Sequence, residues 1–411
     1  MRIVQATDAT LRNDLAGRLS AAVEAVGPVS TPAFVVDLDA FDANAADLVR
    51  RAGGTPIRVA SKSLRVPALV RRALDRPGFA GVLGYTLAEA LWLVAEGGCD
   101  DVVVAYPTVD RTALTSLLST PDAAARVTIM VDDVAHLDLV DRVRRTCGAG
   151  EVTVRVAIDV DAGLRVAGQQ IGPRRSPLYA ADAVVALARN VLARPGFALV
   201  GVMTYEGQVA GVPDAVPGQR GRSAIVRRIK RRSITQLVER RAAIAEALSG
   251  LVDLDFWNAG GSGSLESSSA DPVVTEVTAG SGLLVPGLFD HYRAFTPRPA
   301  AYFGLPVTRV PGPGVVTVHG GGLIASGPAG ADRVPLPWAP AGLRLTGMEG
   351  AGEVQTPLVG DGTTGLRVGD LVWFRHAKSG EPFEHARTVH LVSGDAVVES
   401  VPSYRGLGLA F

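Results

Sequence analysis

Lys62 offers the most distinctive chemistry in the sequence. It lies in the polar stretch Ser61-Lys62-Ser63, between an expected strand at 57–61 and an expected helix that begins near Val66. A lysine at the C-terminal end of a barrel strand opens toward the face where such barrels carry out catalysis. When its amine is desolvated or flanked by cations, its pKa falls and it can form a Schiff base with a carbonyl compound. A solvated lysine in a loop is the alternative interpretation.

Two segments rich in glycine and serine are candidates for anion binding. Segment 258–264 (NAGGSGS) follows the seventh expected strand, and segment 278–282 (TAGSG) follows the eighth. Glycine frees backbone N–H groups to converge on an anion, and serine adds hydroxyl donors. Paired phosphate loops after strands seven and eight recur in barrels, whereas flexible turns without a ligand are the alternative. The candidate contacts are Gly260, Gly261, Ser262, Gly263, Gly280, Ser281 and Gly282.

The elements that must position these residues alternate regularly along the chain. Apolar residues recur at helical spacing between short apolar runs, as at 87–95 and 180–192. Short apolar strands between helices indicate a parallel sheet covered on both faces. Eight such units predict a (β/α)8 barrel, and a doubly wound open sheet is the competing architecture. The expected strands are 57–61, 79–84, 101–106, 127–132, 152–159, 198–205, 254–258 and 273–278.

The sequence pattern changes near residue 295. Proline and glycine become frequent, and short alternating runs, as at 314–319 and 396–401, predict an all-β domain. We therefore expect an N-terminal extension at 1–30, a barrel domain at 31–295 and a β-rich domain at 296–411. The apolar stretch 31–38 is expected to be able to pair with the C-terminal sheet.

Composition and charge narrow the functional classes. Of the 411 residues, 47% are hydrophobic and 20% are charged, and the net charge of zero gives no field that favours nucleic acid or membrane. The first residues lack the apolar core of a signal peptide, and no segment is long and apolar enough to span a bilayer. Cys99 and Cys147 give no disulfide framework. We expect a cytoplasmic protein that binds neither nucleic acid nor membrane.

Two segments carry a resemblance to a known family: 31–44, TPAFVVDLDAFDAN, and 58–63, RVASKS. They resemble the opening of fold-type III pyridoxal-phosphate enzymes, the alanine racemase group. Over residues 25–411 the chain resembles the D-threonine aldolase and D-serine dehydratase branch more than the racemases. The resemblance implies that Lys62 binds pyridoxal 5′-phosphate through a Schiff base.

The same resemblance assigns further contacts to the cofactor. Segment 159–165 matches the part of the family in which an arginine, here Arg165, approaches the pyridoxal ring oxygen. Segment 204–208 resembles the family's segment beside the cofactor, which makes Tyr205 and Gln208 candidates. A surface arginine and a tyrosine that only packs are the alternatives.

The C-terminal domain departs from the pattern of that branch. D-threonine aldolases and D-serine dehydratases have a His-x-Asp or His-x-Cys pair that binds a divalent metal beside the substrate. Here His376 is followed by Lys378, and a protonated ammonium accepts no hydrogen bond and cannot ligate a cation. We expect that the metal is absent and that Lys378 supplies the positive charge. A metal held by His376 and Glu381 is the alternative.

These residues predict a pyridoxal-phosphate-dependent lyase that acts on a D-configured β-hydroxy amino acid, by retro-aldol cleavage or by β-elimination. Lys62 serves as base on its own face, His376 or Lys378 acts at the β-hydroxyl, and Tyr205 lies near the reacting carbon. The alternatives are an amino-acid racemase, an enzyme that forms a carbon–carbon bond, and a non-catalytic pyridoxal-phosphate-binding regulator. The resemblance also implies a head-to-tail homodimer with the active site between a barrel and a β domain.

Overall fold

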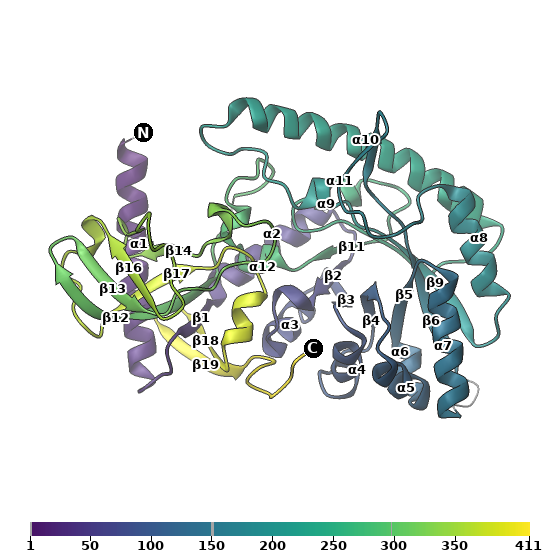
Figure 1. The fold of residues 1–411 in the computed structure, drawn as a ribbon, viewed down its shortest axis with the longest axis horizontal. Coiled ribbons are helices and arrows are strands. Elements are labelled where there is room, and N and C mark those ends of the chain that lie inside the picture. Colours follow the sequence, from purple (N-terminus) through teal and green to yellow (C-terminus); the bar gives the residue numbers. More distant parts are fainter. Residues whose placement is uncertain (1, 149–151, 297) are drawn as a thin grey trace.

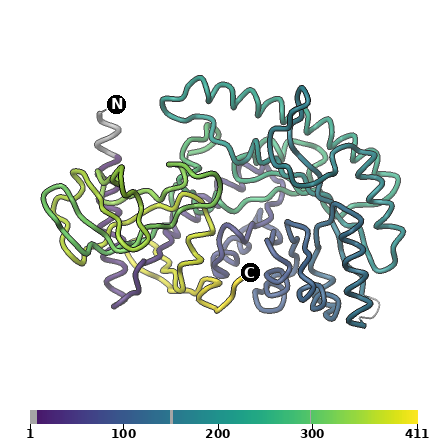
Figure 2. The backbone as a smooth tube through the Cα atoms, viewed as in Figure 1, coloured from purple at the N-terminus to yellow at the C-terminus, as the bar shows by residue number. Residues whose placement is uncertain are grey.

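The protein has two parts that lie side by side in the computed structural model (Figure 1). The structure describes residues 2–148, 152–296 and 298–411. The barrel and its helices occupy one side, and a β-rich part occupies the other, with the C-terminus between them. Figure 2 follows the chain from the purple N-terminal helix, which lies against the β-rich part, through the barrel and back to that part.

Eight parallel strands close into a barrel, which confirms the predicted (β/α)8 class and excludes the open sheet. The last strand pairs with the first, with Val277 opposite Ile57. Each predicted strand is present within a few residues of its expected bounds. The strands are β2 (Ile57–Ala60), β3 (Phe79–Gly84), β4 (Val102–Pro107), β5 (Val127–Val131), β6 (Val154–Asp159), β9 (Phe197–Thr204), β10 (Phe256–Ala259) and β11 (Glu276–Ala279).

Helices cover the outside of the barrel, and side-chain caps begin several of them. The Asp37 carboxylate accepts from two backbone N–H groups at the start of α2 (Leu38–Ala52). Thr86, Asp110 and Asp133 cap α4 (Leu87–Ala95), α5 (Arg111–Ser119) and α7 (Val134–Cys147) in the same way. None of the helices in the described ranges combines the length and apolar composition that crossing a bilayer requires. The longer helices are α2 (Leu38–Ala52), α3 (Pro67–Leu74), α4 (Leu87–Ala95), α5 (Arg111–Ser119), α6 (Pro121–Arg126), α7 (Val134–Cys147), α8 (Ala181–Leu192) and α10 (Arg220–Ser249).

Short elements follow the C-terminal ends of the strands, where the barrel meets the β-rich part. They are the 3-10 turn η1 (Ser61–Ser63), the hairpin β7 (Leu164–Val166) and β8 (Gln169–Ile171), α9 (Gly207–Ala210), α11 (Leu265–Ser269) and α12 (Ser281–Leu284). The hairpin was not expected from the sequence.

A cluster of buried apolar side chains packs together inside the barrel. Phe256 lies in the interior, where a Cβ at Gly201 would overlap its ring. Arg58 forms a bidentate ion pair with Glu276 at 2.8 and 2.7 Å, and its guanidinium lies 5.5 Å from the Phe256 ring centroid. Both charges are buried, and Arg58 also pairs with the exposed Asp101 at 2.8 Å.

A nine-stranded sheet forms the β-rich part. Strand β1 comes from before the barrel, yet it lies between β12, which it pairs antiparallel, and β18, which it pairs parallel. Helix α1 (Arg2–Ala25) packs Leu19 and Val23 into a small core with Trp373. The strands are β1 (Ala33–Asp37), β12 (Ala301–Gly312), β13 (Val315–His319), β14 (Leu336–Ala339), β15 (Arg344–Leu345), β16 (Gln355–Val359), β17 (Leu371–Arg375), β18 (Thr388–Ser393) and β19 (Ala396–Pro402).

Candidate active site

A cavity of about 370 Å³ lies at the C-terminal ends of the barrel strands. Lys62, Tyr205 and both glycine-serine loops line it from the barrel, and Arg333, Lys378 and Ser379 line it from the β-rich part of the same chain. This is the end of a barrel at which active sites form.

The Lys62 amine faces this cavity from the η1 turn. Its Nζ donates a hydrogen bond to the Tyr106 hydroxyl at 2.7 Å. Tyr106 lies near the end of β4, the last residue of the strand predicted at 101–106. The next residue in the turn, Ser63, shares a hydrogen bond of 3.0 Å with Ser281, so that the lysine turn is tied to the second glycine-serine loop.

The β-rich part contacts the lysine turn directly. Gly380 has φ of +96°, and a Cβ at this position would overlap the carbonyl oxygen of Lys62. Arg65 donates from Nε to the same carbonyl at 3.2 Å. Its Nη1 pairs with Glu384 of the β-rich part at 2.6 Å. The position of Lys62 therefore depends on the packing of the two parts.

Replacing Gly380 by alanine is expected to destabilise the fold by about 1–3 kcal/mol through backbone strain, with a further loss from the overlap. Gly365→Ala is the matched control, because Gly365 also has a positive φ of +85° but has nothing within 4 Å of the new Cβ. Urea unfolding of both variants measures the difference. Equal losses in the two would show that the contact with Lys62 is unimportant for stability.

The two glycine-serine loops lie against each other at the cavity wall. The hydroxyl of Ser262 accepts hydrogen bonds from the backbone N–H groups of Gly280 at 3.3 Å and Gly282 at 2.9 Å. A Cβ at Gly280 would lie 2.7 Å from the carbonyl oxygen of Ala60, so only glycine permits this approach to β2. Of the predicted contacts, five line the cavity: Gly260, Gly261, Ser262, Gly280 and Ser281.

Gly263 and Gly282 lie outside the lining of the cavity. A Cβ at Gly263 would overlap the Ala210 carbonyl oxygen, and one at Gly282 would lie 2.9 Å from the Ser262 Cβ. Their role in this structure is close packing behind the loops.

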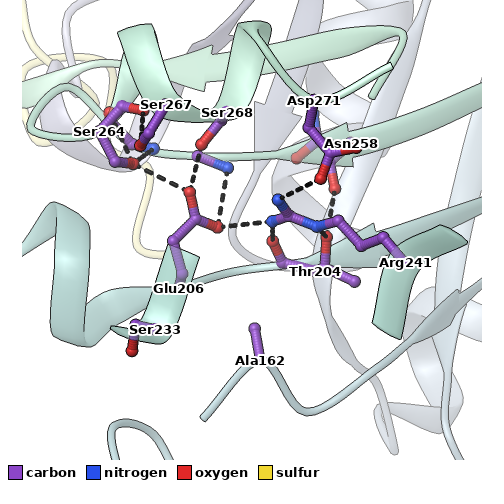
Figure 3. A network of polar contacts seen from close by, with 12 residues as sticks. Ala162, Thr204, Glu206, Ser233, Arg241, Asn258, Ser264, Ser267, Ser268 and Asp271 are labelled. Atoms are coloured by element: carbon purple, nitrogen blue, oxygen red, sulfur yellow. Dashed lines mark hydrogen bonds and ion pairs between the residues drawn. The ribbon is translucent and has the colours of Figure 1, made fainter. Parts of the chain in front are cut away.

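A buried ion-pair network holds the first loop from behind (Figure 3). Glu206 accepts hydrogen bonds from the Gly260 N–H at 3.2 Å and from the hydroxyls of Ser264 at 3.0 Å and Ser268. Arg241 of α10 donates to Glu206 at 3.0 Å and to Asp271 at 3.2 Å. All three charged groups are buried, and together they fix the backbone that precedes Ser262.

Tyr205 and Gln208 have different positions. Tyr205 lines the cavity, and enclosure by the protein, with the negative charge of Glu206, raises the pKa of its hydroxyl to about 12. Gln208 is buried behind the wall, where its Nε2 donates to the Ala162 carbonyl at 2.7 Å and to Ser233 at 3.1 Å. It lies outside the lining of the cavity.

Arg165 also lies outside the cavity, and Arg175 lines it. Arg165 is the middle residue of β7, and because side chains alternate along a strand, it points away from the buried Leu164. Its guanidinium is 3.6 Å from the ring centroid of Tyr179. Arg175 follows the β7–β8 hairpin, and its guanidinium lies 5.9 Å from the ring centroid of Tyr106, the partner of Lys62.

Asp159, at the end of β6, is an acidic group in the cavity wall. Burial raises the pKa of its carboxyl to about 7, the charge of Asp132 adds to this effect, and Arg175 opposes it. Asp159 was not among the site residues expected from the sequence. Its place at the carboxyl end of a barrel strand was the available signal.

The pKa of Asp159 predicts a dependence of stability on pH. In the unfolded chain an aspartate side chain has a pKa of about 3.9. Between this pH and the folded-state pKa of about 7, the folded protein binds more protons than the unfolded chain. Stability contributed by this group is therefore lost as the pH rises to about 7. Asp159→Asn is expected to reduce the fall in thermal midpoint between pH 5 and pH 8, values that bracket the upper part of this range.

Asp253→Asn is the control for that measurement, because Asp253 is exposed. A fall in thermal midpoint that is the same in wild type, Asp159→Asn and Asp253→Asn would contradict the assignment.

His376, Lys378 and Glu381 do not converge on one point. His376 is buried, and burial, with the charge of Arg375, lowers the pKa of its imidazole to about 3, so it is neutral. It reaches the cavity through Ser379, whose hydroxyl is 3.1 Å from its Nε2. Lys378 Nζ lies 3.7 Å from Glu381. Within residues 2–148, 152–296 and 298–411, no group of three or more His, Cys, Asp or Glu side chains could hold a metal ion.

A family model, the alanine racemase N-terminal domain, matches residues 36–285, more than half of the chain. The chain belongs to this family. The match confirms the resemblance inferred from segments 31–44 and 58–63. The matched range includes the Lys62 turn and both glycine-serine loops.

Several proteins of known name are similar to this chain. A D-threonine aldolase from Arthrobacter sp is 27% identical over 263 residues, which make up 63% of this chain and 62% of that relative. The crystal structure of D-threonine aldolase from Filomicrobium marinum has a TM-score of 0.75 at 21% identity, covering 93% of this chain and 96% of that one. D-threo-3-hydroxyaspartate dehydratase from Delftia sp. HT23 has a TM-score of 0.69 at 21% identity, covering 91% and 97%. The two structural likenesses show the shared fold.

Proposed function

We propose that the protein is a pyridoxal 5′-phosphate-dependent lyase that acts on a D-configured β-hydroxy amino acid. The observation that carries the proposal is that the Lys62 amine and two adjoining glycine-serine loops face one cavity at the catalytic end of the barrel. Similarity to proteins named D-threonine aldolase and D-threo-3-hydroxyaspartate dehydratase supports this reaction class.

The residues of the cavity fit the cofactor. Lys62 would hold its aldehyde carbon through an imine, and the hydroxyls of Ser262 and Ser281, which line the cavity, offer neutral donors for a phosphate dianion. Tyr205 offers an aromatic surface beside these loops. When bound, the cofactor supplies an electron sink that stabilises negative charge at the α-carbon of an amino acid.

The chain's own residues would then move protons and orient the substrate. Tyr106, which accepts a hydrogen bond from Lys62, positions that amine when it acts as a base. We assign Lys378 to a contact with the β-hydroxyl of the substrate, or with the oxygen that leaves from it, because Lys378 lines the cavity from the β-rich part. His376 would act by orienting Ser379, the polar side chain that lies between it and the cavity.

We propose that Lys378 supplies the charge that a metal supplies in the D-threonine aldolase branch. The ammonium is held by Ser326 and Glu381, and a protonated amine repels a cation from the same place. Elemental analysis of the purified enzyme tests this assignment. Stoichiometric zinc or manganese that activity requires would contradict it.

Assays with paired D- and L-enantiomers of β-hydroxy amino acids test the reaction class. Release of an aldehyde indicates retro-aldol cleavage, release of ammonia with an oxo acid indicates elimination, and appearance of the opposite enantiomer indicates a racemase. The proposal predicts one of the first two outcomes with D-enantiomers. Inverted enantiomer as the main product would favour the racemase instead.

Arg175 is the group that we assign to the cofactor ring or the substrate carboxylate, in place of Arg165. Arg175→Gln is expected to weaken cofactor binding or kcat/KM by about tenfold or more, because a charged hydrogen-bond donor is lost from the cavity. Arg165→Gln is the matched control and is expected to change either value by less than about twofold. The reverse order in a cofactor titration and steady-state assay would restore Arg165 to the role expected from the sequence.

A further inference from the structure

The β-rich part contributes two cationic side chains to the cavity, in addition to Lys62 and Arg175 of the barrel. Arg333, at the end of the short turn η3 (Ala331–Arg333), and Lys378 both line it. The Nε of Arg333 is buried and has no hydrogen-bond partner in the part of the chain that the structure describes. The Asp332 carboxylate is 3.9 Å away from this nitrogen. The Arg333 side chain as a whole keeps about a fifth of its surface accessible, so its terminal guanidinium nitrogens are available to a ligand in the cavity.

Ser326 fastens the loop that carries Arg333 to the segment that carries Lys378. Its hydroxyl accepts a hydrogen bond from Lys378, and its backbone N–H donates to Glu381 at 3.0 Å. The N–H of Ala325 donates to the carbonyl of Arg333 at 2.9 Å, which joins the two sides of the loop. The two cations are therefore presented by one connected framework.

Among the residues that the structure describes, four cationic side chains line the cavity, whereas the carboxylates of its lining are Asp159 and Asp161, so positive charge is in excess. Asp161 already accepts hydrogen bonds from the Gly163 N–H and from Gln170, both at 2.6 Å. Lys378 is partly balanced by Glu381, whereas the charge of Arg333 is not matched by a close carboxylate inside the cavity. Arg175 lies beside Tyr106, the partner of the Lys62 amine. This position suits a contact with the α-carboxylate of the substrate or with the cofactor.

We infer that Arg333, together with Lys378, binds a second anionic group, so that the preferred substrate is a D-β-hydroxy amino acid with a carboxylate at the end of its side chain. This inference rests on the proposed function and specifies its substrate class. A guanidinium binds a carboxylate through charge-assisted hydrogen bonds, whereas a neutral side chain would leave the charges of Arg333 and Lys378 uncompensated.

D-aspartate and D-asparagine form a matched pair of probes, because they are nearly equal in size, differ in one charge and lack a β-hydroxyl to lose. Each is titrated into the cofactor-loaded protein, and the change in the visible absorption of the cofactor gives an apparent Kd. In wild type, D-aspartate is expected to bind about tenfold or more tightly than D-asparagine. Arg333→Gln is expected to reduce this preference to about twofold or less. Arg309→Gln, at an exposed position outside the cavity, should retain it.

Equal affinities of wild type for the two probes would overturn the inference. So would an equal loss of both affinities in Arg333→Gln, because that result assigns Arg333 to the α-carboxylate that both probes share. If Arg333→Gln does not fold, Lys378→Gln takes its place in the test. Its preference for D-aspartate over D-asparagine must then be lower than that of wild type. If neither probe changes the absorption in any variant and no D-β-hydroxy amino acid is cleaved or dehydrated, the proposed function itself fails, which is a different result from equal binding.

Discussion

Replacing Lys62 by alanine is expected to abolish covalent binding of pyridoxal phosphate and to lower the lyase rate by about 10³-fold or more. Two functions are lost together, because the same amine forms the imine and then acts as a base. The Tyr106 hydroxyl would also lose the donor that it contacts at 2.7 Å. Absorption spectra of the purified variant and steady-state assays measure the two losses.

Lys62→Arg is the control that separates charge from covalent chemistry. A guanidinium keeps the positive charge and can donate to Tyr106, but it forms no imine with the cofactor aldehyde. We expect this variant to fold normally and to be as inactive as Lys62→Ala. An arginine variant with near wild-type activity would mean that the lysine serves only as a cation.

Replacing Glu206 by alanine is expected to have the largest effect on stability, about 3 kcal/mol. The change leaves Arg241 buried with only one of its two carboxylate partners, Asp271 at 3.2 Å. It also removes the acceptor of the Gly260 N–H and of the Ser264 hydroxyl, which lie in the first glycine-serine loop. Affinity for the cofactor should therefore fall by about tenfold or more as well.

Glu239→Ala is the control for that variant, because Glu239 is an exposed carboxylate on the same helix as Arg241. Urea unfolding without the cofactor and fluorescence titration with it measure stability and binding separately. If Glu206→Ala unfolds at the same urea concentration as Glu239→Ala, the buried network does not support the loop.

The sequence was sufficient to predict the barrel and the main features of the candidate site. Alternation of apolar strands and amphipathic helices is a local pattern, and Lys62 and the two loops follow strands directly along the chain. Their convergence then follows from barrel closure, since the carboxyl ends of parallel strands meet at one face. Tyr106 could have been found in the same way, because it lies at the end of a predicted strand.

Other site residues depend on contacts that no local pattern reveals. Arg165 points outward from β7, and the chain after the unexpected β7–β8 hairpin returns Arg175 to the cavity. Arg333 reaches the cavity only because its loop is bound through Ser326 to residues more than 50 positions later in the chain. Glu206 lies next to the candidate Tyr205, but its partner Arg241 comes from α10, 35 residues later in the chain, and no local pattern links the two.

Borohydride reduction followed by peptide mapping tests the central claim most directly. The lysines of the chain are Lys62, Lys230 and Lys378, so the position of a reduced pyridoxyl group can be assigned without ambiguity. We expect the active, cofactor-loaded protein to carry this group on Lys62 alone. A label on Lys230 or Lys378, or an active preparation that carries none, would contradict it.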